Sequence, residues 1–476
     1  MSRGRVRYEV ADRVRATPYG GISVMHQLVE EVGLVGRLNG LEILKRYRPY
    51  MESDHILNIA FNALCGGRVL DDIEHRRFDA AFLDALGART IPDPTTAGDF
   101  CRRFDTGSIL ALMSAINETR IGVWQKQGPE FFAQTARIDA DGSHVATTGE
   151  CKQGMDVTYK GTWGYHPLLV TLANTGEPLY LFNRGGNRPS AEGAEILFDE
   201  AIKLCRSAGF TDILLRGDTD FSLTAYLDGW NAQGVRFVFG YDATKGFVER
   251  AGALPDDDYV ELVRKADQLF AGKRRRKQPR VKERIVKDRG YLDKTLWRED
   301  MAEFDHTPTR AKGTYRIVVL RKEILEHRGQ CFLGTRDKYF FYITNDRDLS
   351  LEQVVRESND RCNQERIIEQ LKGGVRALHA PLNTLHANWA YMVMMSLAWS
   401  LKAWFAMLLP VAPRWRDRHL LDKQRVLAME FRTFVQTFML IPAQVLSTGR
   451  QTVLRFLMWR PELPLLLRLV NLIDTR

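Results

Sequence analysis

Apolar residues in the first part of the chain recur every three or four positions. In segments 28–38 and 56–64 this spacing places them on one side of a helix. Pro92 and Pro94 interrupt the pattern before helical spacing resumes. Residues 1–135 are therefore predicted to form a helical N-terminal region.

The pattern changes near residue 136, where short apolar runs typical of strands replace helical spacing. This order of three strands followed by alternating helices and strands predicts a mixed sheet covered by helices, which we assign to residues 136–244. The strand-like runs are 136–148, 165–173, 178–183, 211–216 and 235–241, and the helical runs are 191–208 and 222–233.

Residues 245–345 interrupt this alternation and are predicted to be an inserted β-rich unit. Its strand-like pieces are 315–321, 331–334 and 339–344. Helical spacing returns over residues 351–372, so we assign residues 346–379 to the sheet-containing core again.

The final segment, residues 380–476, is predicted to be helical and is rich in aromatic and basic residues. Its most apolar stretch, Ala387–Leu401, has about 15 uncharged residues, short of the roughly 18 that a membrane span needs. We therefore expect a buried helix there and no membrane partner.

Positive charge is concentrated in two places. The chain carries a net charge of +9, yet Lys273–Arg289 alone holds ten basic residues against two acidic ones. Residues 380–476 hold twelve basic residues against five acidic ones. Basic patches on a body with its own carboxylates indicate a polyanionic partner.

The six cysteines include no CxxC pair, which argues against a disulfide framework or a zinc site and favours a reducing cytoplasm. The N-terminus has no apolar region of the kind found in secretory signals. We therefore expect a cytoplasmic protein.

Two strand-like segments carry paired aspartates. Asp139 and Asp141 lie on the same face of the strand, because successive side chains of a strand point to opposite faces. Asp is uncommon in strands, so two of them in one strand need an explanation. Asp218 and Asp220 follow a buried strand at its carboxyl end, where functional residues of open α/β sheets collect. Alternation leaves the choice within each pair open, and a turn or a helix cap would also explain such residues.

The helical segment 351–372 carries a third acidic position. At about 100° per residue, four polar residues fall on one narrow stripe, and an apolar set supplies a docking surface. The stripe consists of Ser358, Arg361, Glu365 and Lys372, and the apolar set of Val354, Val355, Ile368 and Leu371. Glu369 competes with Glu365 for the acidic role, and the whole stripe could instead be a solvated helix face.

Carboxylates on two strands of one sheet and on a helix docked against it can converge. Hard divalent cations such as Mg²⁺ take oxygen ligands, and two ions about 4 Å apart support phosphoryl transfer. Arg361 and Lys372, which flank Glu365, would then meet phosphate groups.

Three motifs resemble those of bacterial insertion-sequence transposases. The helical stripe resembles the signature Tyr-x2-Arg-x3-Glu-x6-Lys at three of its four positions, with Ser358 in place of Tyr. Asp141-Gly142-Ser143 resembles the family's Asp-x-Thr/Ser motif. Arg216-Gly217-Asp218-Thr219-Asp220-Phe221 resembles its Arg-Gly-Asp-Ser-Gly-Phe motif, with Asp220 where Gly is usual.

The resemblance implies a DDE transposase of the α/β class. Its fold would be a ribonuclease-H-like mixed-sheet core with a β-rich insertion, flanked by helical N- and C-terminal regions. Asp141, Asp218 and Glu365 would be the catalytic residues and the ligands of two Mg²⁺ or Mn²⁺ ions. The motif positions favour Asp141 over Asp139, Asp218 over Asp220 and Glu365 over Glu369.

The implied partners are the terminal inverted repeats of an insertion sequence and target DNA, held by a homodimer in the bacterial nucleoid. The N-terminal region is a candidate for binding the DNA ends. Arg361, Lys372 and the basic run would contact the DNA backbone; the run consists of Lys273, Arg274, Arg275, Arg276 and Lys277. The departures at Ser358 and Asp220 leave a degenerate transposase that only binds DNA as one alternative. The second alternative is another nuclease with a ribonuclease-H-like core.

Overall fold

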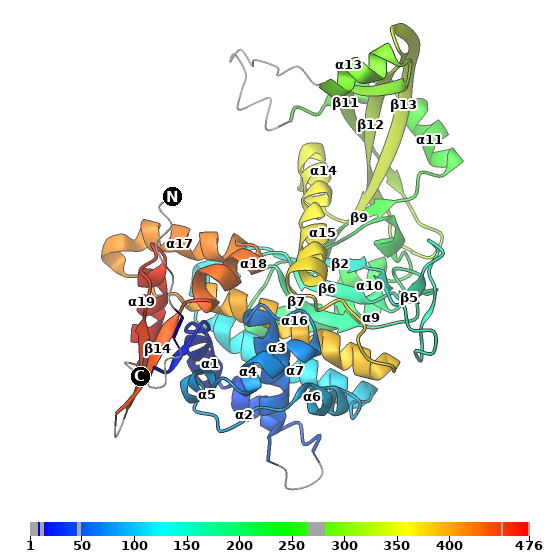
Figure 1. Cartoon of the computed structure of the whole chain (residues 1–476). Coiled ribbons are helices and arrows are strands. Elements are labelled where there is room, and N and C mark those ends of the chain that lie inside the picture. Colours follow the sequence, from blue (N-terminus) through cyan, green and yellow to red (C-terminus); the bar gives the residue numbers. More distant parts are fainter. Residues whose placement is uncertain (1–7, 10–13, 45–48, 265–280, 449–450, 475–476) are drawn as a thin grey trace.

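The protein is a mixed α/β structure built on a large mixed sheet (Figure 1). The computed structural model describes residues 8–9, 14–44, 49–264, 281–448 and 451–474. The predicted basic run at 273–277 lies outside these described residues.

Five strands form the part of the sheet that the sequence pattern predicted. They are β2 (Ala136–Gly142), β6 (Leu168–Leu172), β7 (Glu177–Phe182), β8 (Ile213–Gly217) and β9 (Arg236–Tyr241). Their order across the sheet is β7-β6-β2-β8-β9, with β2 antiparallel to β6 and parallel to β8. The helices between the later strands are α9 (Ala194–Ala208) and α10 (Leu227–Ala232). Asp141 and Asp218 therefore lie at the carboxyl ends of adjacent parallel strands.

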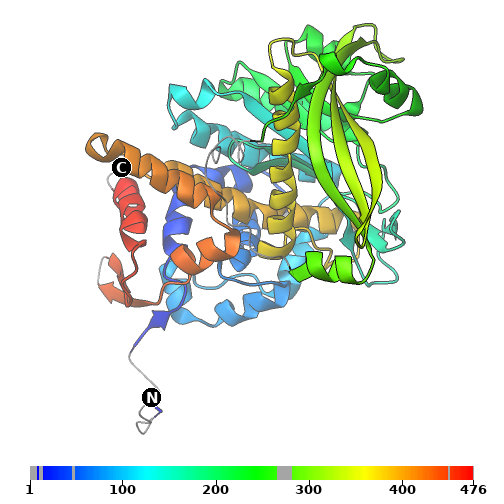
Figure 2. The ribbon, with the colours of Figure 1, turned by 90° about the horizontal axis from the view of Figure 1, so that it is seen from above.

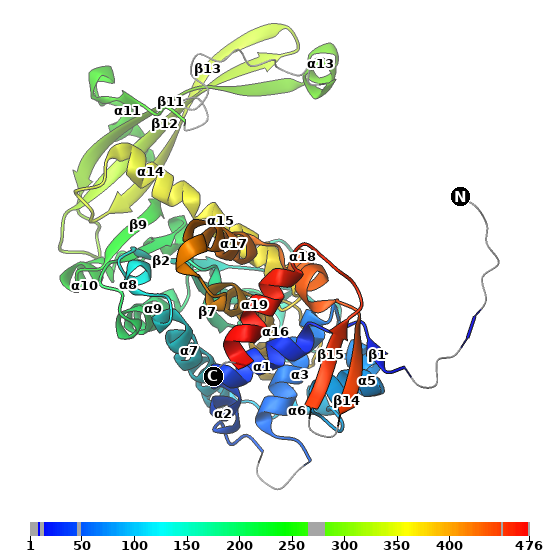
Figure 3. The ribbon, with the colours of Figure 1, turned by 90° about the vertical axis from the view of Figure 1, so that its left-hand side faces the viewer.

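The insertion extends this sheet. It contains β11 (Leu292–His306), β12 (Tyr315–Arg328) and β13 (Cys331–Thr344), and β13 pairs with β9. The predicted pieces 331–334 and 339–344 thus belong to one strand, because their polar spacer continues the ladder with β12 on a solvated part of the sheet. The three long strands project away from the body as an arm (Figures 1 and 3).

One short strand and two helices also lie in the described part of this region. They are β10 (Val260–Glu261), which pairs with β11, together with α11 (Lys245–Gly252) and α13 (Val281–Asp288). α11 lies beside the base of the arm and α13 lies near its far end (Figure 1).

The helix that carries Glu365 is broken into three pieces. They are α14 (Leu351–Asp360), α15 (Cys362–Glu369) and a π-helical turn (Gln370–Gly374), so the predicted helical segment 351–372 is confirmed in extent, while its break at Arg361 and its π-helical end were not predicted. Ser350 caps α14 through a hydrogen bond from the Gln353 N–H. The break at Arg361 follows Asn359 and Asp360, two exposed residues of poor helix propensity.

Helices cover both faces of the core sheet. Val354 and Val355 of α14 are buried in one cluster with Leu214 and Val238 on one face. On the other face α9 packs against β2, β6, β7 and β8. Seen from above, α14 runs beside the long strands of the arm, with which it is in contact (Figure 2). The predicted docking residues Ile368 and Leu371 are buried as well.

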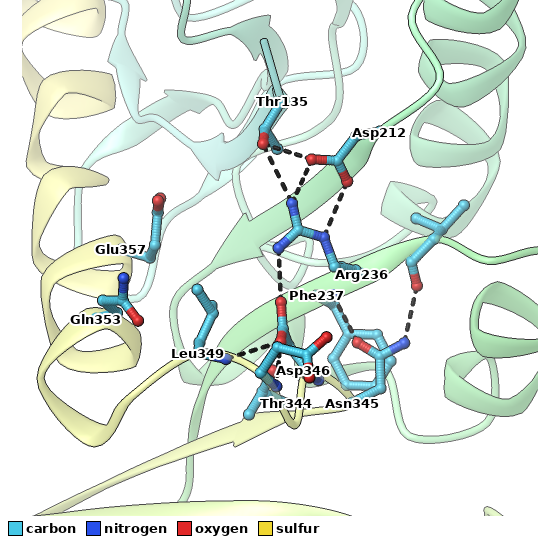
Figure 4. Close-up of polar contacts among 12 residues, drawn as sticks. Thr135, Asp212, Arg236, Phe237, Thr344, Asn345, Asp346, Leu349, Gln353 and Glu357 are labelled. Atoms are coloured by element: carbon cyan, nitrogen blue, oxygen red, sulfur yellow. Dashed lines mark hydrogen bonds and ion pairs between the residues drawn. The ribbon is translucent and has the colours of Figure 1, made fainter. Parts of the chain in front are cut away.

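Arg236 fixes the end of the sheet opposite the carboxylates. Its guanidinium donates hydrogen bonds to Asp212 at 2.9 Å, to Asp346 at 2.6 Å and to Thr135 at 3.1 Å (Figure 4). These partners stand where β2 and β8 begin and where the chain leaves β13. The network therefore holds the starts of the central strands in a fixed arrangement.

The N-terminal region is helical, as the apolar spacing predicted. Its longer helices are α1 (Ile22–Glu31), α2 (Leu34–Asn39), α3 (Glu52–Leu64), α5 (Ala80–Ala85), α6 (Pro94–Cys101) and α7 (Thr106–Gln125). Short helices α4 (Glu74–Arg77) and α8 (Pro129–Phe132) complete it. They pack around α16 (Leu385–Leu408), which contacts α3, α6 and α7.

α16 contains the predicted buried helix. Among the described residues it is the one helix long and apolar enough to cross a membrane, and 94% of its most apolar stretch is buried inside the protein. Such burial is typical of the core helix of a folded domain.

The C-terminal region is less uniformly helical than predicted. It contains α17 (Arg416–Ala428), α18 (Phe431–Phe434) and α19 (Leu463–Asp474), but also the antiparallel strands β14 (Ala443–Thr448) and β15 (Gln451–Phe456). β14 also pairs with β1 (Ala16–Thr17) from the N-terminal region. This long-range partner stabilises a hairpin that the apolar pattern did not reveal.

Candidate active site

Asp139 and Asp141 share a face of β2 but have different partners. Asp139 is fully buried, and both of its oxygens accept hydrogen bonds from Arg216, at 2.7 and 2.9 Å. Asp141 lies at the end of the strand, where its nearest cation is Arg361, with Nη1 3.8 Å from Oδ2. The carboxylate of Asp139 is therefore committed to a buried ion pair, whereas that of Asp141 is not.

The Arg216 pair is part of a network that holds α14 against the sheet. Arg216 Nη1 also donates to Glu357 Oε2 of α14 at 2.9 Å. Arg137 of β2 donates to the same carboxylate at 2.6 and 2.9 Å. Arg216 belongs to the second motif and Glu357 lies in the predicted helical segment 351–372, but the sequence pattern assigned neither a role, because their pairing depends on how β2, β8 and α14 pack together.

Asp141 and Asp218 repel each other electrostatically. The pKa of Asp141 is raised to about 6, first by burial and next by the charge of Asp218, with a smaller contribution from Glu365. Arg361 opposes these effects. Burial also raises the pKa of Asp218. Two interactions oppose this effect: the charge of Arg361, and the hydrogen bond that the Asp220 N–H donates to the Asp218 side chain at 3.0 Å. Asp141, Asp218 and Glu365 therefore lie near enough to interact through their charges.

Gln364 attaches α15 to the sheet beside Asp141. Its side chain is fully buried, accepts a hydrogen bond from the Thr171 hydroxyl and donates to the Leu169 carbonyl at 3.4 Å. Leu169 is the register partner of Asp141 across β2 and β6. The next residue, Glu365, is thereby held near the end of β2 with its side chain exposed.

The two predicted phosphate-binding residues also reach this region. Arg361 lies at the break between α14 and α15, and its buried Nη1 has no hydrogen-bond partner among the described residues. Lys372 lies in the π-helical turn; burial and Lys160 lower its pKa, and Asp141 raises it. π-helical turns occur often at functional sites. Five of the predicted residues are thus brought together: Asp141, Asp218, Glu365, Arg361 and Lys372.

The competing acidic residues have other surroundings. Asp220 and Glu369 are both exposed, and Ser358 is half-buried on α14. The backbone N–H of Asp220 donates a hydrogen bond to the side chain of Asp218, which caps the short helical turn Thr219–Ser222.

The carboxylates fit a divalent cation in donor type, but they do not form a closed ligand cluster. Among the described residues, no group of three or more His, Cys, Asp or Glu side chains is assembled tightly enough to hold a metal ion. Carboxylate oxygens are the ligands that Mg²⁺ prefers. The raised pKa values of Asp141 and Asp218 show negative charge that a cation would compensate.

Comparisons with known proteins place the chain in a family. None of the curated proteins matches it. One solved structure that matches is the piggyBac transposase synaptic complex with hairpin DNA, at 10% identity and a TM-score of 0.35, with 89% of this chain and 82% of that chain covered. The model of the family described as transposase DDE domain group 1 matches residues 14–475. The chain therefore belongs to this DDE transposase family.

Proposed function

We propose that the protein is an active transposase that cleaves the ends of its insertion sequence and joins them to target DNA by metal-dependent phosphoryl transfer. The observation that carries this proposal is the placement of Asp141 and Asp218 at the carboxyl ends of the adjacent parallel strands β2 and β8, with Arg361, at the break between α14 and α15, 3.8 Å from Asp141. Asp139, the alternative to Asp141, is occupied by Arg216.

In this proposal Asp141, Asp218 and Glu365 hold two Mg²⁺ or Mn²⁺ ions. Two such ions activate a water or a 3′-hydroxyl and stabilise the leaving oxygen when they are bound. Gln364 and the Glu357 network keep α14 and α15 against the sheet, which positions Glu365.

Arg361 and Lys372 bind the phosphates that flank the scissile bond. Both are close enough to the carboxylates to affect the pKa of Asp141 or to be affected by its charge. An arginine suits this role because its planar guanidinium can donate two hydrogen bonds to a phosphate.

The wider setting follows from the same family. We propose a ribonuclease-H-like core, supported by acidic residues at the carboxyl ends of β2 and β8. The DNA partners are the terminal inverted repeats and target DNA, held by a homodimer in the bacterial nucleoid. The run Lys273–Lys277 and the N-terminal region supply further DNA contacts.

Cleavage of labelled DNA tests the proposal and separates it from its alternatives. The substrate is a duplex from the DNA that flanks this gene, incubated with the protein and Mg²⁺. Nicking followed by transfer into a plasmid supports a transposase, and Asp141→Asn should abolish both steps. Nicking without transfer indicates another nuclease, and binding without nicking indicates a non-catalytic DNA-binding protein.

A further inference from the structure

Three aromatic rings, two of them stacked, lie in contact with one another beside the candidate active site, and we call them the stack. The rings of His144 and His166 are stacked with centroids 4.3 Å apart, and Tyr159 meets His144 edge-on at 4.8 Å. His166 exposes 3% of its surface, whereas Tyr159 exposes 79%. The stack therefore runs from the interior to solvent and leaves the Tyr159 ring largely free.

The inner end of the stack touches the residue next to Asp141. A Cβ atom on Gly142 would lie 2.7 Å from His166 Nε2, so the imidazole lies directly against this glycine. On its other side His166 Nδ1 donates a hydrogen bond to the Arg188 carbonyl at 2.8 Å. These two contacts hold the His166 imidazole in place, and His144 packs on it.

A small sheet places the outer rings. It consists of β3 (Val145–Ala146), β4 (Asp156–Val157) and β5 (Trp163–Tyr165) in the order β3-β5-β4. His144 directly precedes β3, His166 follows β5, and Tyr159 lies in the turn between β4 and β5. Tyr159 therefore belongs to the segment that directly follows β2, the strand that carries Asp141.

Two lysines face His144 in the stack, whereas Asp220 lies near enough to act on His166. Lys160 Nζ lies 5.4 Å from the centre of the Tyr159 ring. The pKa of His144 is lowered to about 4, by burial first and then by His166, Lys160 and Lys372. Both lysines thus act on the same site, from the β4–β5 turn and from the π-helical turn after Glu365. A DNA strand that enters here would meet Lys160 beside the exposed Tyr159 ring and Lys372 near His144.

We propose that Tyr159 stacks on an unpaired nucleobase of the DNA end held at the carboxylates, while Lys160 and Lys372 bind neighbouring phosphates. The inference rests on the proposed transposase function and adds a binding surface to it. Aromatic rings bind bases of any sequence through their faces, and flanking cations follow the backbone. A base must leave its duplex to stack in this way, so the surface selects single-stranded DNA at the cut end.

The test uses a DNA duplex with a short single-stranded 3′ overhang that carries 2-aminopurine, whose fluorescence falls when it stacks. We expect wild-type protein to quench the probe. Tyr159→Ala should lose the quenching and bind the overhang about tenfold more weakly, while its affinity for a blunt duplex stays unchanged. Tyr159→Phe keeps the ring and should behave as the wild type.

Phe78→Ala is the matched control, since Phe78 is 76% exposed and lies in the N-terminal region. It should leave the quenching intact. Undiminished quenching by Tyr159→Ala, or equal loss in Tyr159→Phe, overturns the inference. If Tyr159→Ala and Tyr159→Phe then still cleave an element end normally, the transposase function stands and only the base-stacking role of Tyr159 is refuted. A wild-type protein that binds neither DNA refutes both.

Discussion

Both oxygens of the Asp139 carboxylate accept a hydrogen bond from Arg216, and the two side chains expose no more than 2% of their surface. The pair joins adjacent parallel strands, and through Glu357 it also joins them to α14. Asp141, the proposed metal ligand two residues further along β2, thus differs from Asp139, whose carboxylate has a structural role.

Asp139→Asn should therefore lower the stability of the protein, whereas Asp141→Asn should abolish its DNA cleavage. Removing the charge of Asp139 weakens a buried pair and should lower the free energy of unfolding by about 3 kcal/mol or more. Asp141→Asn should fold stably and lose DNA cleavage, because a neutral amide is a poor ligand for a divalent cation. Urea unfolding and nicking assays on both variants measure this. A stable, inactive Asp139→Asn protein would reverse the assignment.

Glu365→Gln should abolish cleavage and leave DNA binding nearly intact, whereas Glu369→Gln should be tolerated. The two glutamates are exposed on the same helix, but only the charge of Glu365 is among those that raise the pKa of Asp141. Binding should persist because contacts with many phosphates supply most of it. Nicking of a labelled element end compares the variants, and an inactive Glu369→Gln beside an active Glu365→Gln would refute this choice.

Lys402 predicts a specific dependence of stability on pH. Its side chain is 1% exposed, and burial lowers its pKa to about 7, with a further contribution from Arg366. Between pH 7 and pH 10 the unfolded chain binds a proton that the folded chain does not, so stability should rise with pH. This residue should contribute up to about 1.4 kcal/mol per pH unit.

Replacing Lys402 with Met should remove that contribution, and it should leave cleavage unchanged because Lys402 bonds the Leu427 carbonyl away from the carboxylates. Unfolding at several pH values gives the slope for both proteins. Lys203→Met, at an exposed position on α9, is the control and should retain the wild-type slope. An identical slope in Lys402→Met would show that the buried amine stays charged.

Neutralising the basic run at Lys273–Lys277 should weaken DNA binding equally for all sequences. Each lost phosphate contact should reduce the slope of log K against log salt concentration by about 0.9. Binding titrations at several salt concentrations measure this slope. If glutamine at all five positions leaves it unchanged, the run makes no phosphate contacts.

The sequence pattern predicted those features that depend on local spacing. The order of the five strands of the large sheet from β2 to β9 and of the two helices between them is confirmed, and so is the burial of Val354, Val355, Ile368 and Leu371. The predicted strand 136–148 is divided into β2 and β3, and the small sheet of β3, β4 and β5 was not predicted. Features that depend on distant partners were missed. Asp139 and Arg216 are register partners separated by 77 positions, and β14 depends on β1 at the other end of the chain.

The break at Arg361 was missed for a related reason. A helical wheel assumes regular geometry, so it cannot show that α14 and α15 follow different parts of the sheet. Glu357 binds Arg137 and Arg216, whereas Gln364 binds β6. Arg361, Glu365 and Lys372 of the predicted stripe lie near enough to Asp141 to interact with it through their charges, whereas a role for Ser358 stays a prediction.

The pairing of β13 with β9 has a mechanical consequence. β13 runs without interruption from the far part of the arm to the strand next to β8, over about 45 Å at about 3.3 Å per residue. No flexible linker absorbs a force applied along this strand. A load on the distal arm is therefore transmitted as bending of the sheet itself, and it arrives one strand away from Asp218.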